Sequence, residues 1–167
     1  MTGLGRNAGA FWAAATSVLV LDVVTKYIAE HSLTLHVPQR VIGDVVRWTL
    51  AYNPGAAFSM SLGPASRWIF GAFAVVALVV LWQMYRGCRP EERLKTLALG
   101  LAWGGAAGNL YDRARSAAGV VDFIDIGIGN VRFWTFNVAD SALSVGAVTL
   151  GIILLREDRQ EKPASGD

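Results

Sequence analysis

Two aspartates stand out as candidate chemical groups in the C-terminal third of the chain. Asp122 follows two valines and precedes Phe123, and Asp140 opens the last apolar run of the sequence. The stretch between them is long enough to fold back and bring the two carboxyl groups together. Two neighbouring carboxyl groups ionise unequally, because like charges disfavour double ionisation. Such a pair supplies a proton donor and a general base near neutral pH, as in an aspartic protease.

Each aspartate also has a simpler interpretation. Asp140 could cap the helix that follows it, since aspartate accepts hydrogen bonds from the free N–H groups at a helix start. Asp122 could be an ordinary solvated acid in a loop. The two residues alone leave both interpretations open.

The composition is that of an integral membrane protein with one domain. The 167 residues are 53% hydrophobic and only 17% charged, whereas about 25% of residues are charged in a typical soluble domain. The net charge of +2 gives no reason to expect a nucleic-acid partner. The single cysteine, Cys88, excludes an intramolecular disulfide, and His31 and His36 lack the spacing of zinc ligands. We therefore expect neither a metal nor another cofactor.

Four apolar segments predict four transmembrane helices, over residues 10–28, 68–85, 96–111 and 141–155. A helix needs about 20 residues to cross a bilayer, so we expect the third helix to continue past Asp112 and the fourth to begin near Ala139. The candidate acids would then lie at a membrane edge, where an ionisable side chain is costly unless it is paired or functional. A signal peptide is the alternative for the first segment, but Asp22 and Lys26 fit it poorly.

Two segments between the first and second apolar runs alternate apolar and polar residues, as strands do. They cover residues 33–37 and 48–52 on either side of Gly43-Asp44, and are followed by an Asn53-Pro54-Gly55 turn. This part of the chain carries too many charges to cross a membrane. We expect a small β platform on one membrane face, with Trp48 and Tyr52 at the interface.

Basic residues predict the orientation in the membrane. The connection from Arg86 to Lys95 holds four basic side chains in ten positions, and short basic loops stay in the cytoplasm. Both termini are therefore expected on the cytoplasmic side, and the loop with Asp122 and Asp140 on the opposite side. Residues 1–157 are expected to form one membrane domain, and the polar residues 158–167 a disordered tail.

Other polar residues have structural interpretations beside functional ones. Asp22 and Lys26 are four residues apart and share a helix face, which favours a structural salt bridge over catalysis. Asn109 and Arg113 also share a face, and could orient a peptide or hold the outer loop. Ordinary turn formation would explain two further asparagines, Asn53 and Asn137.

The order of five short motifs is far more specific than any one of them. The chain resembles the lipoprotein signal peptidases, which are the type II signal peptidases of bacteria. The matching stretches are Asp22-Val-Val-Thr25-Lys26, Asn53-Pro-Gly55-Ala-Ala-Phe58, Gly104-Gly-Ala-Ala-Gly108-Asn109-Leu-Tyr-Asp112-Arg113, Val120-Val-Asp122-Phe and Phe136-Asn137-Val-Ala139-Asp140-Ser141. They occur in the order of that family and span nearly the whole chain, apart from its first ten residues and its tail.

The resemblance implies a membrane α-helical fold of four transmembrane helices with a small periplasmic β platform. It places the catalytic acids at Asp122 and Asp140, and the first-helix motif at the expected ion pair of Asp22 and Lys26. It further implies a substrate site lined by Asn53, Gly55, Asn109, Arg113, Asn137 and Ala139.

The activity implied is that of an aspartic endopeptidase in the bacterial cytoplasmic membrane. Its substrates would be prolipoproteins with a diacylglyceryl group on a cysteine, and it would cut just before that cysteine. Membrane lipids would surround it, and globomycin, a cyclic peptide, is the implied inhibitor. One protonated aspartate would polarise the scissile carbonyl while the other, ionised, removes a proton from water.

Two functions of other classes remain open from the residues alone. Asp22, Asp122 and Asp140 could relay protons in a small transporter, although no inverted repeat is visible. The run of small residues from Gly104 to Gly108, which close helix packing explains without any function, could serve a non-enzymatic membrane assembly. Release of a signal peptide from a lipid-modified precursor separates the peptidase from both.

Overall fold

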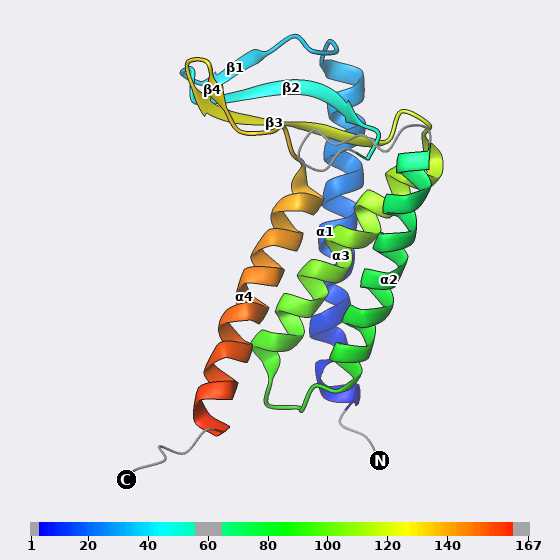
Figure 1. Cartoon of the computed structure of the whole chain (residues 1–167), viewed down its shortest axis with the longest axis vertical. Coiled ribbons are helices and arrows are strands. Elements are labelled where there is room, and N and C mark those ends of the chain that lie inside the picture. Colours follow the sequence, from blue (N-terminus) through cyan, green and yellow to red (C-terminus); the bar gives the residue numbers. More distant parts are fainter. Residues whose placement is uncertain (1–3, 56–64, 162–167) are drawn as a thin grey trace.

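A computed structural model describes residues 4–55 and 65–161 of the chain. The helices within these ranges are α1 (Leu4–Ser32), α2 (Ser66–Arg86), α3 (Arg93–Arg115) and α4 (Val138–Glu161). The strands are β1 (Gln39–Ile42), β2 (Val46–Asn53), β3 (Val120–Ile128) and β4 (Val131–Arg132). The helices lie side by side in a bundle, and the strands form a sheet across one end of it (Figure 1).

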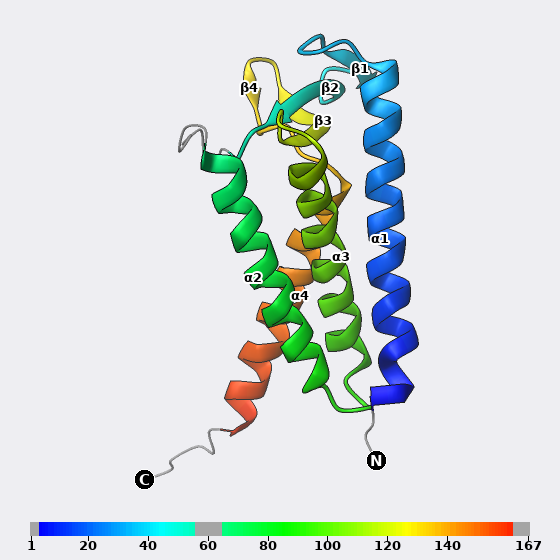
Figure 2. The same cartoon turned by 90° about the vertical axis from the view of Figure 1, so that its right-hand side faces the viewer.

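Helix α3 is central to the bundle and contacts α1, α2 and α4 (Figure 2). Its small residues allow this, because glycine lets two helix backbones approach closely. A Cβ atom at Gly104 would lie only 2.5 Å from the backbone oxygen of Ala15 in α1. A Cβ atom at Gly105 would collide with the backbone oxygen of Ala139 in α4. The glycines of α3 therefore serve helix packing, as their spacing predicted.

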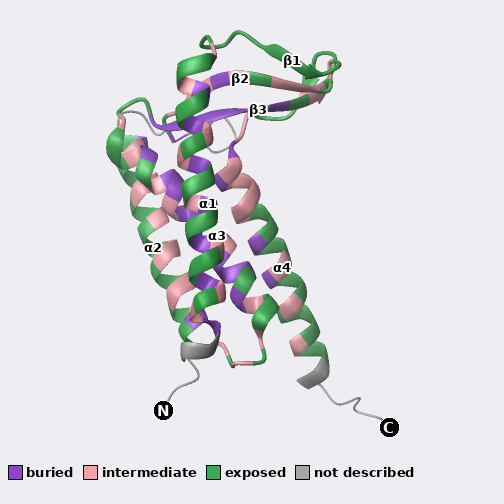
Figure 3. Ribbon diagram, turned by 180° about the vertical axis from the view of Figure 1, so that it is seen from behind, coloured by how far each residue is buried: buried purple, intermediate pink, exposed green. Residues whose placement is uncertain are grey.

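Within the described part of the chain, three helices are long and apolar enough to cross a membrane, over Asn7–Ser32, Ser66–Arg86 and Val138–Arg159. Their outward faces expose apolar side chains such as Val20, Val76 and Val148, which suits a lipid environment (Figure 3). Helix α3 has 23 residues but is more polar, and it buries Asn109 and Asp112 inside the bundle. The predicted membrane α-helical class is confirmed, while the number of four crossings stays a prediction.

The sheet is antiparallel, with the strand order β1-β2-β3-β4. The sequence predicted a β platform made of strands at residues 33–37 and 48–52. Strand β2 confirms the second of these strands. The first strand is shifted, because β1 rather than residues 33–37 forms the partner strand, and Leu35 makes only an isolated bridge to Leu50. The turn explains the shift: Gly43 has a φ of 52°, and the tight turn pairs Ile42 with Val46, so the residues nearest the turn form the hairpin.

Strands β3 and β4 correct the expectation that Asp122 lies in a loop. Val120, Val121 and Phe123 are buried, and β-branched and aromatic residues of this kind favour strands. Pairing with β2 places Asp122 opposite Ala51. The sequence did not reveal this pairing, because the two strands are separated along the chain by two helices.

The helix ends place the candidate acids at the junction between the bundle and the sheet. Helix α3 continues past Asp112 and α4 begins at Val138, as their lengths predicted. The start of α1, the α2–α3 connection and the end of α4 lie together at the opposite end of the bundle (Figure 1). Residues 158–161, the first part of the predicted tail, form the last turn of α4. Residues 162–167 of the predicted tail lie outside the described ranges.

Candidate active site

Strand β3 holds the carboxyl group of Asp122 at the sheet end of the bundle. Asp122 is only 4% exposed. Its Oδ1 atom accepts a hydrogen bond of 2.7 Å from Nδ2 of Asn137, the residue that precedes α4. Asp122 is therefore a buried carboxyl group with an amide partner, and the solvated loop acid of the simpler interpretation is excluded.

Asp140 lies in the first turn of α4 and forms a reciprocal capping box with Asn137. The backbone N–H of Asp140 donates to Asn137 Oδ1 over 2.8 Å, and the backbone N–H of Asn137 donates to Asp140 Oδ2 over 3.3 Å. The capping interpretation of Asp140 is thus partly right, although the residue at the cap position is Asn137. The second oxygen, Oδ1, accepts a hydrogen bond of 2.7 Å from Asn109 Nδ2, which a cap alone does not require.

Asn137 joins the two candidate acids. Its Nδ2 donates to Asp122 while its Oδ1 accepts the backbone N–H of Asp140. The same Nδ2 lies 3.2 Å from Asn109 Oδ1 and 3.2 Å from the carbonyl oxygen of Val121. Asn137 is fully buried, and its side-chain amide contacts both candidate acids. Its place in the substrate site stays a prediction.

Burial raises the pKa of Asp122 from 3.8 to about 7. The largest cause is the loss of solvation around the charged form, and the second is the nearby charge of Asp140. Hydrogen bonds from Asn137 and Asn53 and the charge of Lys26 act in the opposite direction without cancelling these effects. A carboxyl group with a pKa of about 7 is partly protonated at neutral pH, so Asp122 can donate a proton.

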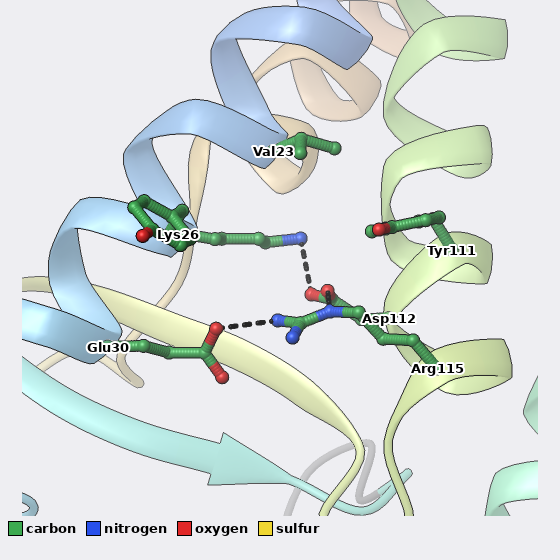
Figure 4. A pocket seen from close by; sticks show the side chains of 7 residues that line it. Val23, Lys26, Glu30, Tyr111, Asp112 and Arg115 are labelled. Atoms are coloured by element: carbon green, nitrogen blue, oxygen red, sulfur yellow. Dashed lines mark hydrogen bonds and ion pairs between the residues drawn. The ribbon is translucent and has the colours of Figure 1, made fainter.

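Lys26 of α1 lies at the centre of a second group of acids. Its Nζ atom is 2.6 Å from Asp22 Oδ2 and 2.9 Å from Asp112 Oδ2, and all three side chains are at most 1% exposed. Figure 4 shows Lys26 reaching toward Asp112, beside Arg115 and Glu30, which extend the network through ion pairs of 2.9 Å. A buried charge is tolerated when it is paired in this way. The ion pair expected from the spacing of Asp22 and Lys26 is therefore present, with a third partner.

Lys26, Asp22 and Asp112, which we call the Lys26 group, are connected by hydrogen bonds to the start of α4. Lys26 Nζ donates a hydrogen bond of 3.0 Å to Asn109 Oδ1, and the amide of Asn109 in turn binds Asp140. Asp22 Oδ1 accepts the backbone N–H of Ala139 over 2.9 Å. Ala139 is fully buried, and its place in the substrate site stays a prediction. Asn109 is also buried and serves as the link between the two groups of acids.

Asp112 was not among the predicted site residues, although it holds the strand that carries Asp122. Its Oδ2 atom accepts the backbone N–H of Val121 over 3.2 Å in addition to the ion pair with Lys26. One signal in the sequence could have found it: Asp112 lies three residues after Asn109, so both side chains share a face of α3. The contact between the backbone N–H of Val121 and this face of α3 depends on the tertiary fold.

Asn53 and Gly55 form the turn that leaves β2 beside Asp122. Asn53 Oδ1 accepts the backbone N–H of Gly55 over 3.0 Å, which is an Asx turn. Gly55 has a φ of 109°, and a Cβ atom there would lie 2.7 Å from Phe70 Cδ2. Only glycine suits both conditions. Residues 56–58, the rest of this motif, lie outside the described ranges.

Arg113 approaches the acids from α3 without pairing closely with either of them. Its Nη1 donates to the carbonyl oxygen of Asn109 over 3.2 Å, and its guanidinium lies 5.9 Å from the ring centre of Phe70. The charges of Asp140 and Asp122 attract it. Arg113 is half-buried, so it retains surface for a ligand, unlike Asn137.

A sequence comparison decides the family. The family described as signal peptidase (SPase) II matches residues 14–156. The chain belongs to the signal peptidase II family. It is therefore a peptidase, and the matched region contains both groups of acids.

Named relatives and a solved structure agree with this family. The lipoprotein signal peptidase of Pseudomonas putida is 43% identical over 149 residues, which cover 87% of this chain and 86% of that protein. That of Pseudomonas syringae pv. tomato is 41% identical over 162 residues, covering 95% and 91%. A bacterial membrane enzyme solved by the in meso method at 2.3 Å resolution is similar, with a TM-score of 0.82, 30% identity and 95% of each chain covered.

Proposed function

We propose that this signal peptidase II is an aspartic endopeptidase that removes the signal peptide from prolipoproteins bearing a diacylglyceryl group. It cuts just before the lipid-modified cysteine. The observation that carries the proposal is the bonding of Asp122 and Asp140 to one buried asparagine, with the pKa of Asp122 raised to about 7. A pair of carboxyl groups with unequal proton affinity is the requirement for aspartic protease chemistry.

The proposed reaction begins with attack of water on the scissile carbonyl carbon. Asp140 removes a proton from this water, and Asp122 donates its proton to the carbonyl oxygen. The C–N bond of the tetrahedral intermediate then breaks. Asp140 returns its proton to the leaving amino group of the cysteine, while Asp122 regains one from the hydroxyl group, so both acids return to their starting states.

Asp140 suits the role of the ionised partner because both of its oxygens accept N–H groups, from Asn109 and Asn137. Asp122 suits the role of the acid because burial disfavours its charge. Arg113 stays half-buried beside both of them and is the residue we assign to the substrate backbone. Asn53 is assigned the same role on the β2 side of the acids.

The position of the acids suits a substrate that is anchored in lipid. They lie where α3 and α4 meet the sheet (Figure 1), and therefore at one end of helices that can cross a membrane. A diacylglyceryl-modified precursor reaches such a site by lateral diffusion. We place this end at the periplasmic face of the bacterial inner membrane and both termini in the cytoplasm, since the basic α2–α3 connection lies at the opposite end.

A cleavage assay with matched substrates tests the proposal. The purified full chain is mixed with a precursor peptide that carries the diacylglyceryl group on its cysteine, and with the same peptide lacking the lipid. Mass spectrometry should find a single cut before the cysteine in the lipid-modified peptide, and a globomycin-like cyclic peptide should block it. Equal cleavage of the unmodified peptide would refute the assigned substrate class, and a proton flux without any cleavage would favour the transporter.

A further inference from the structure

A cavity of about 290 Å³ lies between α2 and α3 near the sheet end of the bundle, apart from the Lys26 group. Arg67 and Arg113 line it together with Trp68, and its other lining residues are small or apolar. None of the lining residues is acidic. The cavity therefore combines two positive charges with an apolar wall.

Both arginines keep a donor that has no partner among the described residues. The Nε atoms of Arg67 and Arg113 are buried and have no hydrogen-bond partner. Within the described residues no carboxylate oxygen lies within 4.0 Å of either guanidinium, although Asp140 attracts Arg113 at longer range. Among the described residues, Arg67 donates a long hydrogen bond of 3.4 Å to the carbonyl oxygen of Ala114 and stacks 4.5 Å from the ring centre of Trp68. Unused guanidinium donors at a shared cavity call for an anion.

The start of α2 adds to the positive potential. Arg67 lies in the first turn of α2, where the helix dipole favours an anion. No side chain of the described residues caps this helix start at Ala65. The start of α2 and the two arginines thus all contribute positive potential near this cavity.

We propose that this cavity binds the phosphate group of an anionic membrane phospholipid. The forked guanidinium matches phosphate oxygens, and basic pockets between transmembrane helices bind lipid headgroups. Trp68 is 68% exposed at the end of a membrane-spanning helix, where an indole ring contacts the bilayer interface. Val75 lines the cavity farther along α2 and Val76 is exposed beside it, so an acyl chain has an apolar surface to follow.

The bound lipid would lie next to the peptidase site, because Arg113 borders both. The proposal nevertheless does not rest on the peptidase function, since binding is measurable without cleavage. Arg67 is the residue to test because it belongs to the cavity and not to the acid groups.

Ligand-dependent unfolding of the purified full chain in neutral detergent micelles tests the site, since a ligand that binds only the folded state raises the unfolding midpoint. Three matched probes are titrated: a short-chain phosphatidylglycerol, the diacylglycerol with the same chains, and inorganic phosphate. Only phosphatidylglycerol should raise the midpoint substantially. An equal effect of diacylglycerol would refute phosphate recognition, and an equal effect of inorganic phosphate would replace the lipid with a free anion.

Variants locate the site. Arg67→Gln should need about ten-fold more phosphatidylglycerol for the same shift, because it loses charge-assisted hydrogen bonds. Arg67→Lys keeps the charge without the fork and should be intermediate. Arg40→Gln is the control, since it removes the same charge from an arginine of β1 that is 77% exposed, and it should titrate like the unchanged protein. A wild-type titration of both Arg67 variants would overturn the proposal.

Discussion

Two pairs of aspartates meet at the junction of the bundle and the sheet, and a different side chain bridges each pair. In the lysine-bridged pair, the ammonium group of Lys26 contacts both Asp22 and Asp112. In the asparagine-bridged pair, the neutral amide of Asn137 is bonded to Asp122 and Asp140. Both pairs are largely inside the protein, so burial alone does not distinguish them.

The bridge decides what each pair can do. A cation between two buried carboxylates compensates their charge and makes the group a cross-link between α1 and α3. The neutral side-chain amide of Asn137 contacts the carboxyl group of Asp122 and the backbone N–H of Asp140, and it compensates no charge. The Asp122–Asp140 repulsion therefore persists, and with burial it raises the pKa of Asp122 to about 7. The lysine-bridged pair stabilises the site, and the asparagine-bridged pair is left able to exchange protons.

The largest effect is expected from substitutions in the asparagine-bridged pair. Asp122→Asn and Asp140→Asn should each lower the cleavage rate about 10⁴-fold or more, because asparagine keeps the shape but cannot exchange a proton. The double variant should be little worse than either single one, since the two acids act as a unit. Cleavage kinetics with an unfolding curve for each variant provide the measurement.

Asp125 provides the matched control on the same strand. Its carboxylate accepts hydrogen bonds from Thr49 over 3.1 Å and from Arg132 over 2.8 Å, within the sheet. Asp125→Asn should therefore remain active. An active Asp140→Asn variant would mean that Asp140 is only part of a helix cap, where asparagine serves about as well.

The next largest effect concerns the lysine-bridged pair. Lys26→Met should destabilise the protein by about 3–5 kcal/mol, because it leaves two buried carboxylates without a counter-charge. Asp22→Asn should cost less, since Lys26 keeps Asp112 and the Asn side chain can still accept the Ala139 N–H. Unfolding in detergent measures both. Normal stability with collapsed turnover in either variant would assign that residue to the reaction.

The smallest effect is the pH dependence of the asparagine-bridged pair. Because Asp122 must be protonated to act as the acid, cleavage should decline as the pH rises through about 7. The folded pKa lies above the usual 3.8, so the associated stability is fully present below about pH 4 and is lost as the pH rises through about 7. Unfolding midpoints measured across this range should decline for the unchanged protein. Asp122→Asn should remove that part of the decline, and an unchanged slope in this variant would contradict the raised pKa.

Much of the fold could be predicted from composition and segment length. The apolar runs identified all four helices, and the length of a membrane crossing predicted the extension of α3 past Asp112 and the start of α4 near Ala139. The same reasoning missed β3, because a short apolar run is compatible with a loop, a strand or a helix end. Its partner β2 precedes it by two helices, so no local pattern connects them.

The sequence by itself determined which residues are candidates: the motif order singled out Asp122 and Asp140 for the chemistry and the i, i+4 pair of Asp22 and Lys26 for an ion pair. Only the tertiary structure decided what surrounds each of them. It brought Asp112 to Lys26 and buried Asn137 between the two candidate acids. The physical reason is that protonation and charge compensation depend on distances of a few ångströms between side chains from different elements. Such distances arise only when α1, α3, β3 and α4 pack together.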